Sequence, residues 1–286
     1  MTDAAGLVVV DKPAGITSHD VVSRVRRLAG TRKVGHAGTL DPMATGVLLV
    51  GVNRATRLLG HLMLTEKAYD ATIRLGVTTV TDDAEGEVLG EASTDALAEQ
   101  AVRAGLAAMI GDIEQRPSAV SAIKVEGRRA YDRVRAGEQI DLPARTVRID
   151  AIDVTRLDLP EIDVRVRCSS GTYIRAIARD LGETLGVGGH LTALRRTAVG
   201  PFTTADARTL DALSDDFAML PIAEVARRCF PALDLDGEQA ASVRVGRALP
   251  VVAAHEGPIA LFAPDGGFLA LYERARDGIR PVAVFV

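Results

Sequence analysis

The stretch Lys33–Gly51 reads KVGHAGTLDPMATGVLLVG and holds four glycines, one histidine and one aspartate. Its last part, GVLLVG, is an apolar run typical of a buried strand. Asp41 precedes Pro42, which biases its backbone toward an extended conformation. Neither a P-loop nor a GxGxxG dinucleotide pattern occurs. Taken alone, the aspartate favours an Asx-turn, although the glycines also suit close approach of the backbone to a bulky ligand.

Strand and helix patterns surround this stretch without regular alternation. The predicted elements are strands over 6–12, 46–52 and 67–76, two strands within 145–171, and helices within 17–30, 53–64, 94–111 and 172–186. We expect Ser18 to cap the first helix and an acidic turn to occupy residues 78–90. Because strands adjoin strands as often as helices intervene, the sequence predicts an α+β fold with a mixed, mostly antiparallel sheet. The last sixty or so residues predict a small β-rich module.

Composition narrows the class of protein. The chain has 286 residues, of which 47% are hydrophobic and 25% charged, as in ordinary globular proteins. It lacks both a membrane-length apolar run and a signal-peptide pattern, so we expect a cytoplasmic protein without a membrane role. Cys168 and Cys229 are expected to be buried thiols. Five scattered histidines show no metal-ligand spacing, and we expect no metal site.

Charge is distributed unevenly along the chain. Residues 1–60 hold eight Lys/Arg against four Asp/Glu, and residues 116–148 hold the same numbers, so each region carries +4. Residues 203–286 hold eight against twelve and carry −4. Two basic regions on an acidic protein suit local binding to a polyanion. On charge alone, however, solvated helix faces are slightly favoured.

Four segments together resemble a known family. They are DKPAGITSHDVV (11–22), GHAGTLDPMATGVL (35–48), EKAYDATIRLG (66–76) and CSSGTYIRAIARDLG (168–182). In this order they closely resemble the motifs of the TruB-type tRNA pseudouridine synthases. SAIKVEGRRAYDRVRAG (121–137) and HLTALRRTAVGPF (190–202) fit the same family. The resemblance replaces the Asx-turn interpretation of Asp41.

The resemblance implies an RNA-modifying isomerase that converts uridine to pseudouridine at position 55, in the TΨC arm of tRNA. It implies a pseudouridine synthase catalytic domain over 1–228, an RNA-gripping insertion at about 117–145, and a reduced PUA-like domain over 229–286. The reaction is an isomerisation without redox change, so no cofactor is expected. We expect tRNA as the partner, no obligate protein partner, and a monomer.

The resemblance also assigns the site residues. Asp41 matches the catalytic aspartate and Tyr69 the tyrosine that stacks on the target base. Tyr173 and Arg175 match residues that contact the nucleotide, and Arg175 pairs with the aspartate. The other residues matched to the substrate site are His36, Leu194, Lys12 and Pro13. A second acid nearby would raise the pKa of Asp41, so we expect a lone carboxylate that Arg175 keeps ionised.

Two groups of basic residues are candidates for contacts with the RNA backbone. The first group is Arg24, Arg26, Arg27, Arg32 and Lys33. The second, within the insertion, is Arg128, Arg129, Arg133 and Arg135. Phosphate contacts position an RNA and carry little sequence information.

Two other functions remain open from the sequence. One is a related pseudouridine synthase that acts on another RNA. The other is a tRNA-binding or tRNA-folding protein whose chemistry is secondary, for which Asp41 would not be required.

Overall fold

The computed structural model describes residues 4–118, 124–125, 128–129, 142–251 and 256–286. Most of its strands belong to one large sheet. They are β1 (Gly6–Lys12), β2 (Val34–Ala37), β3 (Thr45–Val52), β4 (Lys67–Leu75), β7 (Gly111–Gln115), β10 (Arg145–Asp158), β11 (Glu161–Cys168), β12 (Gly189–Val199), β13 (Phe202–Thr203), β14 (Arg208–Thr209) and β15 (Leu220–Pro221). The main strand order is β14-β1-β3-β12-β4-β11-β10-β7, with β13, β15 and β2 pairing to β12, β1 and β3.

Three smaller sheets complete the described strands. The C-terminal sheet has the order β16-β17-β18-β19, and two hairpins pair β5 with β6 and β8 with β9. Their bounds are β16 (Ala232–Asp234), β17 (Ile259–Phe262), β18 (Phe268–Ala275), β19 (Gly278–Val284), β5 (Val77–Thr79), β6 (Val88–Glu91), β8 (Lys124–Val125) and β9 (Arg128–Arg129). The four-stranded sheet falls within the predicted C-terminal domain, whose boundary remains a prediction.

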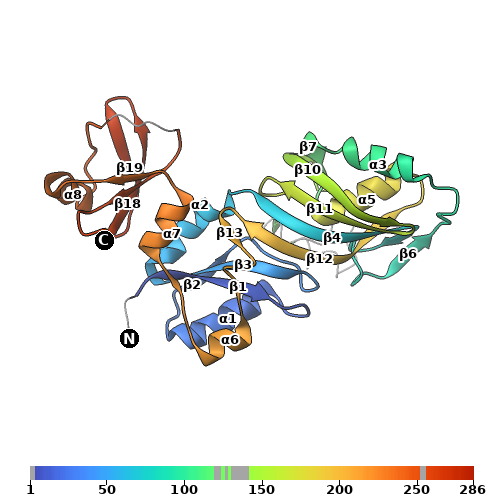
Figure 1. Cartoon of the computed structure of the whole chain (residues 1–286), viewed down its shortest axis with the longest axis horizontal. Coiled ribbons are helices and arrows are strands. Elements are labelled where there is room, and N and C mark those ends of the chain that lie inside the picture. The colour runs from blue at the N-terminus through green and yellow to red at the C-terminus, as the bar shows by residue number, and fades with distance from the viewer. Residues whose placement is uncertain (1–3, 119–123, 126–127, 130–141, 252–255) are drawn as a thin grey trace.

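Most of the described helices pack against the large sheet, whereas α8 packs against the C-terminal sheet. Their bounds are α1 (Ser18–Ala29), the 3-10 helix η1 (Asn53–Leu58), α2 (Leu59–Met63), α3 (Glu99–Ala107), α5 (Ile174–Thr184), α6 (Leu210–Asp215), α7 (Ile222–Cys229) and α8 (Gly237–Arg244). Figure 1 shows α1 and α6 against the β1–β3 end, α3 and α5 against the β10–β11 end, and the C-terminal sheet beyond α7. Among the described helices, none is both long and apolar enough to cross a membrane.

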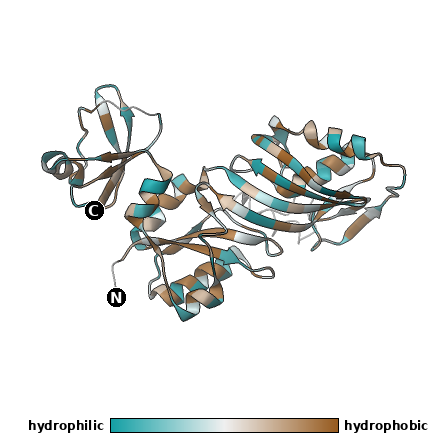
Figure 2. Ribbon diagram, in the orientation of Figure 1, coloured by the Kyte–Doolittle hydropathy of each residue, from teal (hydrophilic) through white to brown (hydrophobic). Residues whose placement is uncertain are grey.

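The α+β prediction is confirmed, because the large sheet is mixed and mostly antiparallel. Its parallel pairs are β1 with β14 and β3 with β12. The helix predicted over 172–186 is present as α5, and its apolar residues Ile174, Ile177 and Leu181 are at most 4% exposed. In Figure 2, the ribbons of the helices alternate between hydrophilic and hydrophobic residues, as expected for helices with one buried face.

Some predicted boundaries are wrong. Helix α1 is capped by Thr17, because its side chain accepts from the Asp20 amide while Asp20 accepts from the Thr17 amide, a reciprocal capping box that Ser18 cannot form. Helix α3 is shorter than the predicted 94–111, since its flanks form tight turns with bonds between residues three apart. The C-terminal module also contains a helix, α8, that was not expected.

The two halves of the large sheet meet where β3 runs beside β12. Only two register pairs join these strands, Thr45 with Arg195 and Gly46 with Arg196. Gly46 has φ 97°, and a Cβ there would lie 2.1 Å from the Arg196 carbonyl oxygen. Glycine is therefore required for this close approach. The loop that carries Asp41 enters β3 at this junction, between the two halves.

Candidate active site

The loop between β2 and β3 carries Asp41. Hydrogen bonds from the Lys12 side chain hold the main chain of this loop. The Lys12 ammonium is fully buried and donates to the carbonyl oxygens of Pro13, Pro42 and Ala44, at 2.9, 3.1 and 2.7 Å. Burial lowers the pKa of Lys12 to about 8, against the opposing effect of Asp41. Lys12 thus holds the main chain directly after Asp41 and adds positive charge beneath it.

Two further side chains hold the preceding part of the loop. The Ser18 hydroxyl donates to the Leu40 carbonyl oxygen at 3.1 Å and accepts from the Leu40 amide at 2.9 Å. Arg196, only 1% exposed, donates to the carbonyl oxygens of Gly38, Thr39 and Val47. Hydrogen bonds on both sides of Asp41 therefore fix the backbone conformation of the loop. Of the three side chains that make them, Lys12 and Arg196 are charged and Ser18 is neutral.

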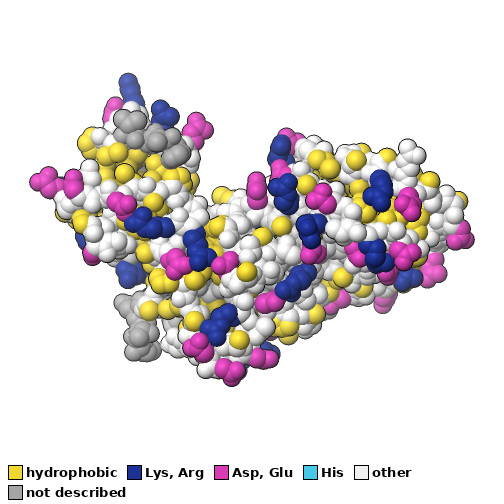
Figure 3. All heavy atoms as spheres, viewed as in Figure 1, with side chains coloured by type: hydrophobic (Ala, Val, Ile, Leu, Met, Phe, Trp, Pro, Cys, Tyr) yellow, Lys and Arg dark blue, Asp and Glu magenta, His cyan; other side chains and the backbone are white. Residues whose placement is uncertain are grey.

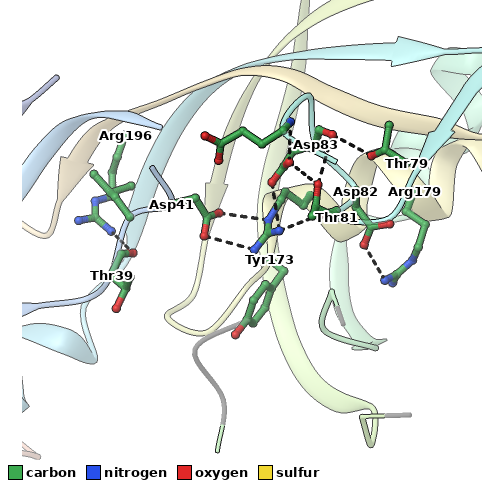
Figure 4. Close-up of polar contacts among 12 residues, drawn as sticks. Thr39, Asp41, Thr79, Thr81, Asp82, Asp83, Tyr173, Arg179 and Arg196 are labelled. Atoms are coloured by element: carbon green, nitrogen blue, oxygen red, sulfur yellow. Dashed lines mark hydrogen bonds and ion pairs between the residues drawn. The ribbon is translucent and has the colours of Figure 1, made fainter. Parts of the chain in front are cut away.

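Arg175 joins Asp41 to a second carboxylate. Its Nη2 lies 3.2 Å from Asp41 Oδ1 and its Nε 3.1 Å from Asp41 Oδ2, so the pair is bidentate. Its Nη1 lies 3.1 Å from Asp83 Oδ2 and donates to the Thr81 carbonyl oxygen at 2.7 Å. Figure 4 shows Asp41, Thr81 and Asp83 gathered around these contacts. The predicted pairing of Arg175 with Asp41 is present.

The expectation of a lone carboxylate is wrong, because Asp83 shares the cation with Asp41. Asp83 is 2% exposed and accepts from the Glu85 amide at 3.0 Å. It lies in the acidic turn that follows β5, next to Asp82, which pairs with Arg179 at 3.3 Å. Sequence spacing gives no sign of this contact, since the turn resembles a solvated linker.

Burial and neighbouring charges shift the pKa of the Asp41 carboxylate in opposite directions. Its side chain keeps 33% exposure, whereas that of Arg175 keeps 5%. Burial raises the pKa of Asp41, Arg175 lowers it, and Asp83 raises it further. Lys12 and Arg196 lower it more weakly. The net pKa lies above the usual aspartate value, yet the bidentate cation favours the ionised form that a nucleophile or a charge-stabilising group requires.

Tyr69 and Leu194 lie on neighbouring strands beside this pair. Both are 7% exposed, Tyr69 on β4 and Leu194 on β12. The Tyr69 hydroxyl hydrogen-bonds with Arg196, and burial raises the pKa of Tyr69 while Arg196 lowers it. Arg196 therefore contacts both the Asp41 loop and Tyr69. Arg196 was not assigned to the site from the sequence. One pattern could have indicated it: Arg196 lies two residues after Leu194 on a strand, so both side chains share a face.

Tyr173 and His36 border the site from other elements. Tyr173 is the N-cap residue of α5, directly before the helix turn that carries Arg175. His36 lies on β2, with its ring 5.4 Å from that of His19 in an edge-to-face arrangement. Burial lowers the pKa of His36, as do His19 and Arg196, so this imidazole is neutral near pH 7. Pro13 is exposed beside Lys12.

The candidate backbone contacts are spread over the surface. Arg24, Arg27, Arg32 and Lys33 are exposed along and after α1, and Arg26 donates to the Val34 carbonyl oxygen. Arg128 and Arg129 form β9, whereas Arg133 and Arg135 lie outside the described residues. Figure 3 shows basic and acidic side chains interspersed over the face in view. Within the described ranges, no three His, Cys, Asp or Glu side chains gather as a metal site requires.

Replacement of Asp83 by Asn is expected to lower the pKa of Asp41. Asp83 is one of the groups that raise this pKa, and the amide removes its negative charge while keeping its shape. Carboxyl ¹³C NMR titration, with the Asp41 signal assigned from Asp41→Asn, measures the midpoint. Asp82→Asn is the control, since Asp82 pairs with Arg179. An Asp41 midpoint that is unchanged in Asp83→Asn, or that moves to higher pH, would contradict the expected effect of the Asp83 charge on Asp41.

Family models match most of the chain, including Asp41, Tyr69, Tyr173 and Arg175. A family model described as "TruB family pseudouridylate synthase (N terminal domain)" matches residues 26–174. Two others match later parts of the chain: "tRNA pseudouridylate synthase B C-terminal domain" matches 175–227, and "tRNA Pseudouridine synthase II, C terminal" matches 230–286.

Curated relatives and solved structures agree with these models. The chain is 58% identical to "tRNA pseudouridine synthase B" of Thermobifida fusca, over 99% of each chain. It is 57% identical to the protein of the same name from Nocardia farcinica, over 98% of this chain and 92% of the relative. Among solved structures, one titled "Crystal Structure of a Cbf5-Nop10-Gar1 Complex" matches with a TM-score of 0.77 and 26% identity, over 98% of this chain and 85% of the other.

Proposed function

Because the chain belongs to the TruB family of pseudouridylate synthases, we propose that it converts uridine to pseudouridine at position 55, in the TΨC arm of tRNA. The relatives named tRNA pseudouridine synthase B support tRNA as the substrate. One structural observation carries the proposed mechanism: the part-exposed Asp41 carboxylate lies in a bidentate pair with buried Arg175. We therefore assign Asp41 as the catalytic aspartate.

The reaction is an isomerisation of the nucleoside. The N1–C1′ bond breaks, the uracil turns, and a C5–C1′ bond forms, while C5 loses a proton and N1 gains one. An anionic group at the junction of sugar and base either attacks a carbon or stabilises positive charge on the ribose. Asp41 supplies that group, and no cofactor takes part in this scheme.

The surrounding side chains are proposed to orient Asp41 and to bind the flipped nucleotide. Arg175 aims the carboxylate and offsets the effect of burial on its pKa. Tyr69 stacks on the uracil that has left the RNA helix, Leu194 lines the uracil pocket, and Tyr173 contacts the nucleotide. Flipping a base costs a few kcal/mol, and stacking on an aromatic ring returns about 1–3 kcal/mol.

RNA binding is assigned to the outer residues. His36 contacts the RNA as a neutral side chain, and Lys12 with Pro13 supports the site from behind. Arg24, Arg27, Arg32, Lys33, Arg128, Arg129 and Arg133 are proposed to contact phosphates. Loss of one such contact weakens binding and lowers its salt dependence without removing the chemistry.

The proposed organisation has a catalytic domain over 1–228, with the RNA-gripping insertion at about 117–145, and a PUA-like domain over 229–286. The C-terminal sheet and α8 lie within the last of these ranges. We propose that the enzyme acts on tRNA in the cytoplasm as a monomer, without an obligate protein partner.

Tritium release tests the proposed substrate position. A tRNA transcript labelled with [5-³H]uridine is expected to release tritium in proportion to the tRNA present, because C5 loses its hydrogen at the modified uridine. A transcript with cytidine in place of uridine 55 is expected to release none. Equal release from both transcripts would show that another uridine is modified. Absence of release from the first would favour a role in tRNA binding or folding.

A further inference from the structure

The main chain of Tyr173 is held by a buried glutamine that the assigned site does not include. Gln115 ends β7 and is 1% exposed. Its Nε2 donates to the Tyr173 carbonyl oxygen at 3.1 Å, and its Oε1 accepts from the Tyr173 amide at 2.8 Å. The two bonds close a ring between one side chain and one residue's backbone. Both polar atoms of this buried amide are therefore paired with the backbone of Tyr173.

The ring of Tyr173 is held by an arginine. The Arg145 guanidinium carbon lies 4.8 Å from the centroid of the Tyr173 ring, within the range of a cation–π contact. Arg145 also donates to the Gly171 carbonyl oxygen. Gly171 has φ 86°, a left-handed conformation that favours glycine. The arginine therefore contacts both the turn before α5 and the ring of Tyr173.

Gln115 and Arg145 are direct neighbours across the sheet. Gln115 is the last residue of β7, Arg145 is the first of β10, and the two are register partners in this antiparallel pair. Residues 116–144 join them and contain most of the predicted insertion. The two side chains that hold Tyr173 thus stand where this segment leaves and re-enters the sheet.

We infer that Gln115 and Arg145 are positioning residues that hold the backbone and one ring face of Tyr173, so that its other face meets the target nucleotide. The inference deepens the proposed function and rests on it, because it concerns how a substrate-contacting tyrosine is oriented. It differs from a phosphate contact by Arg145, which would act on affinity and would not depend on the aromatic ring.

A double-mutant cycle on single-turnover rates tests this inference, since only interacting residues give non-additive effects. Arg145→Ala is expected to slow the rate at saturating enzyme about fivefold or more, with the stem-loop Kd changed about twofold or less. In a Tyr173→Ala background the same change should slow the rate no further. In a Tyr173→Phe background, which keeps the ring, the effect should persist. Gln115→Ala should behave like Arg145→Ala.

The matched control is Arg148→Ala, three residues further along β10. Arg148 is 61% exposed and pairs with Asp112 and Asp150 on the surface. Its loss should leave both rate and Kd unchanged. The inference would be overturned if Arg145→Ala slowed the single-turnover rate equally in the Tyr173→Ala and wild-type backgrounds. It would also be overturned if Arg145→Ala weakened stem-loop binding and its salt dependence but left the single-turnover rate unchanged.

A spectroscopic readout separates this inference from the proposed function. In protein labelled with 3-fluorotyrosine, the ¹⁹F signal of Tyr173, assigned from Tyr173→Phe, should shift in Arg145→Ala and stay in Arg148→Ala. This result needs no turnover. An unshifted signal contradicts the positioning role, whereas inactive wild-type protein with a shifted signal contradicts only the proposed function.

Discussion

Asp41→Asn is expected to bind a TΨC stem-loop with normal affinity and to lose turnover by about 10⁴-fold or more. The amide keeps the shape of the carboxylate but has no negative charge with which to attack or stabilise the ribose. Arg175 keeps its contacts with Asp83 and the Thr81 carbonyl oxygen. The free energy of unfolding should therefore change by no more than about 1 kcal/mol.

The control for this variant is Asp163→Asn. Asp163 has 35% side-chain exposure, close to the 33% of Asp41, and it also pairs with an arginine, Arg156, at 2.7 Å. That pair lies on β10 and β11, outside the site described above. Tritium release, filter binding and thermal unfolding distinguish the two variants. Turnover by Asp41→Asn at the level of Asp163→Asn would remove Asp41 from the mechanism.

Replacement of Arg175 is expected to affect both stability and turnover. Arg175→Met leaves Asp41 and Asp83 near each other without their cation, which should cost about 3–5 kcal/mol of folding free energy. The pKa of Asp41 should rise further, because Arg175 is the main group that lowers it. Turnover at neutral pH should fall by about 10²-fold or more.

Two companion variants separate these effects of Arg175. Arg175→Lys should fold but stay slow, because one ammonium cannot bind Asp41 bidentately while also reaching Asp83 and the Thr81 carbonyl oxygen. Adding Asp83→Asn to Arg175→Met should recover part of the lost stability, since one unpaired buried charge is removed, without recovering turnover. Chemical denaturation and tritium release measure the two quantities. Wild-type turnover in Arg175→Lys would show that bidentate pairing is unnecessary.

The sequence was most informative where a pattern is local. The alternating residues of β11 and the inward face of α5 follow from side-chain periodicity, which the fold keeps. Asp41 and Arg175 were matched through family resemblance, and the structure brings them together although 134 positions separate them. Neither composition nor spacing alone predicts that contact.

Asp83 and Gln115 could not be predicted from the sequence, because their roles depend on tertiary contacts. Asp83 reaches Arg175 only because the turn after β5 folds back toward α5, and a run of acidic residues in a turn is usually solvated. Gln115 carries no charge and no periodic signal, yet it is buried against Tyr173 because β7 ends there. Buried polar side chains of this kind are specified by partners distant in sequence.

Whether Asp41 acts on the target nucleotide is tested most directly by the structure of a complex with a TΨC stem-loop that carries 5-fluorouridine at the target position. We expect a flipped uridine stacked on Tyr69, with a carboxylate oxygen of Asp41 within about 3.5 Å of a reacting carbon of the sugar or base. Arg175 should still contact that carboxylate in a bidentate manner. A nucleotide bound elsewhere, or an Asp41 side chain turned away from it, would contradict the assignment.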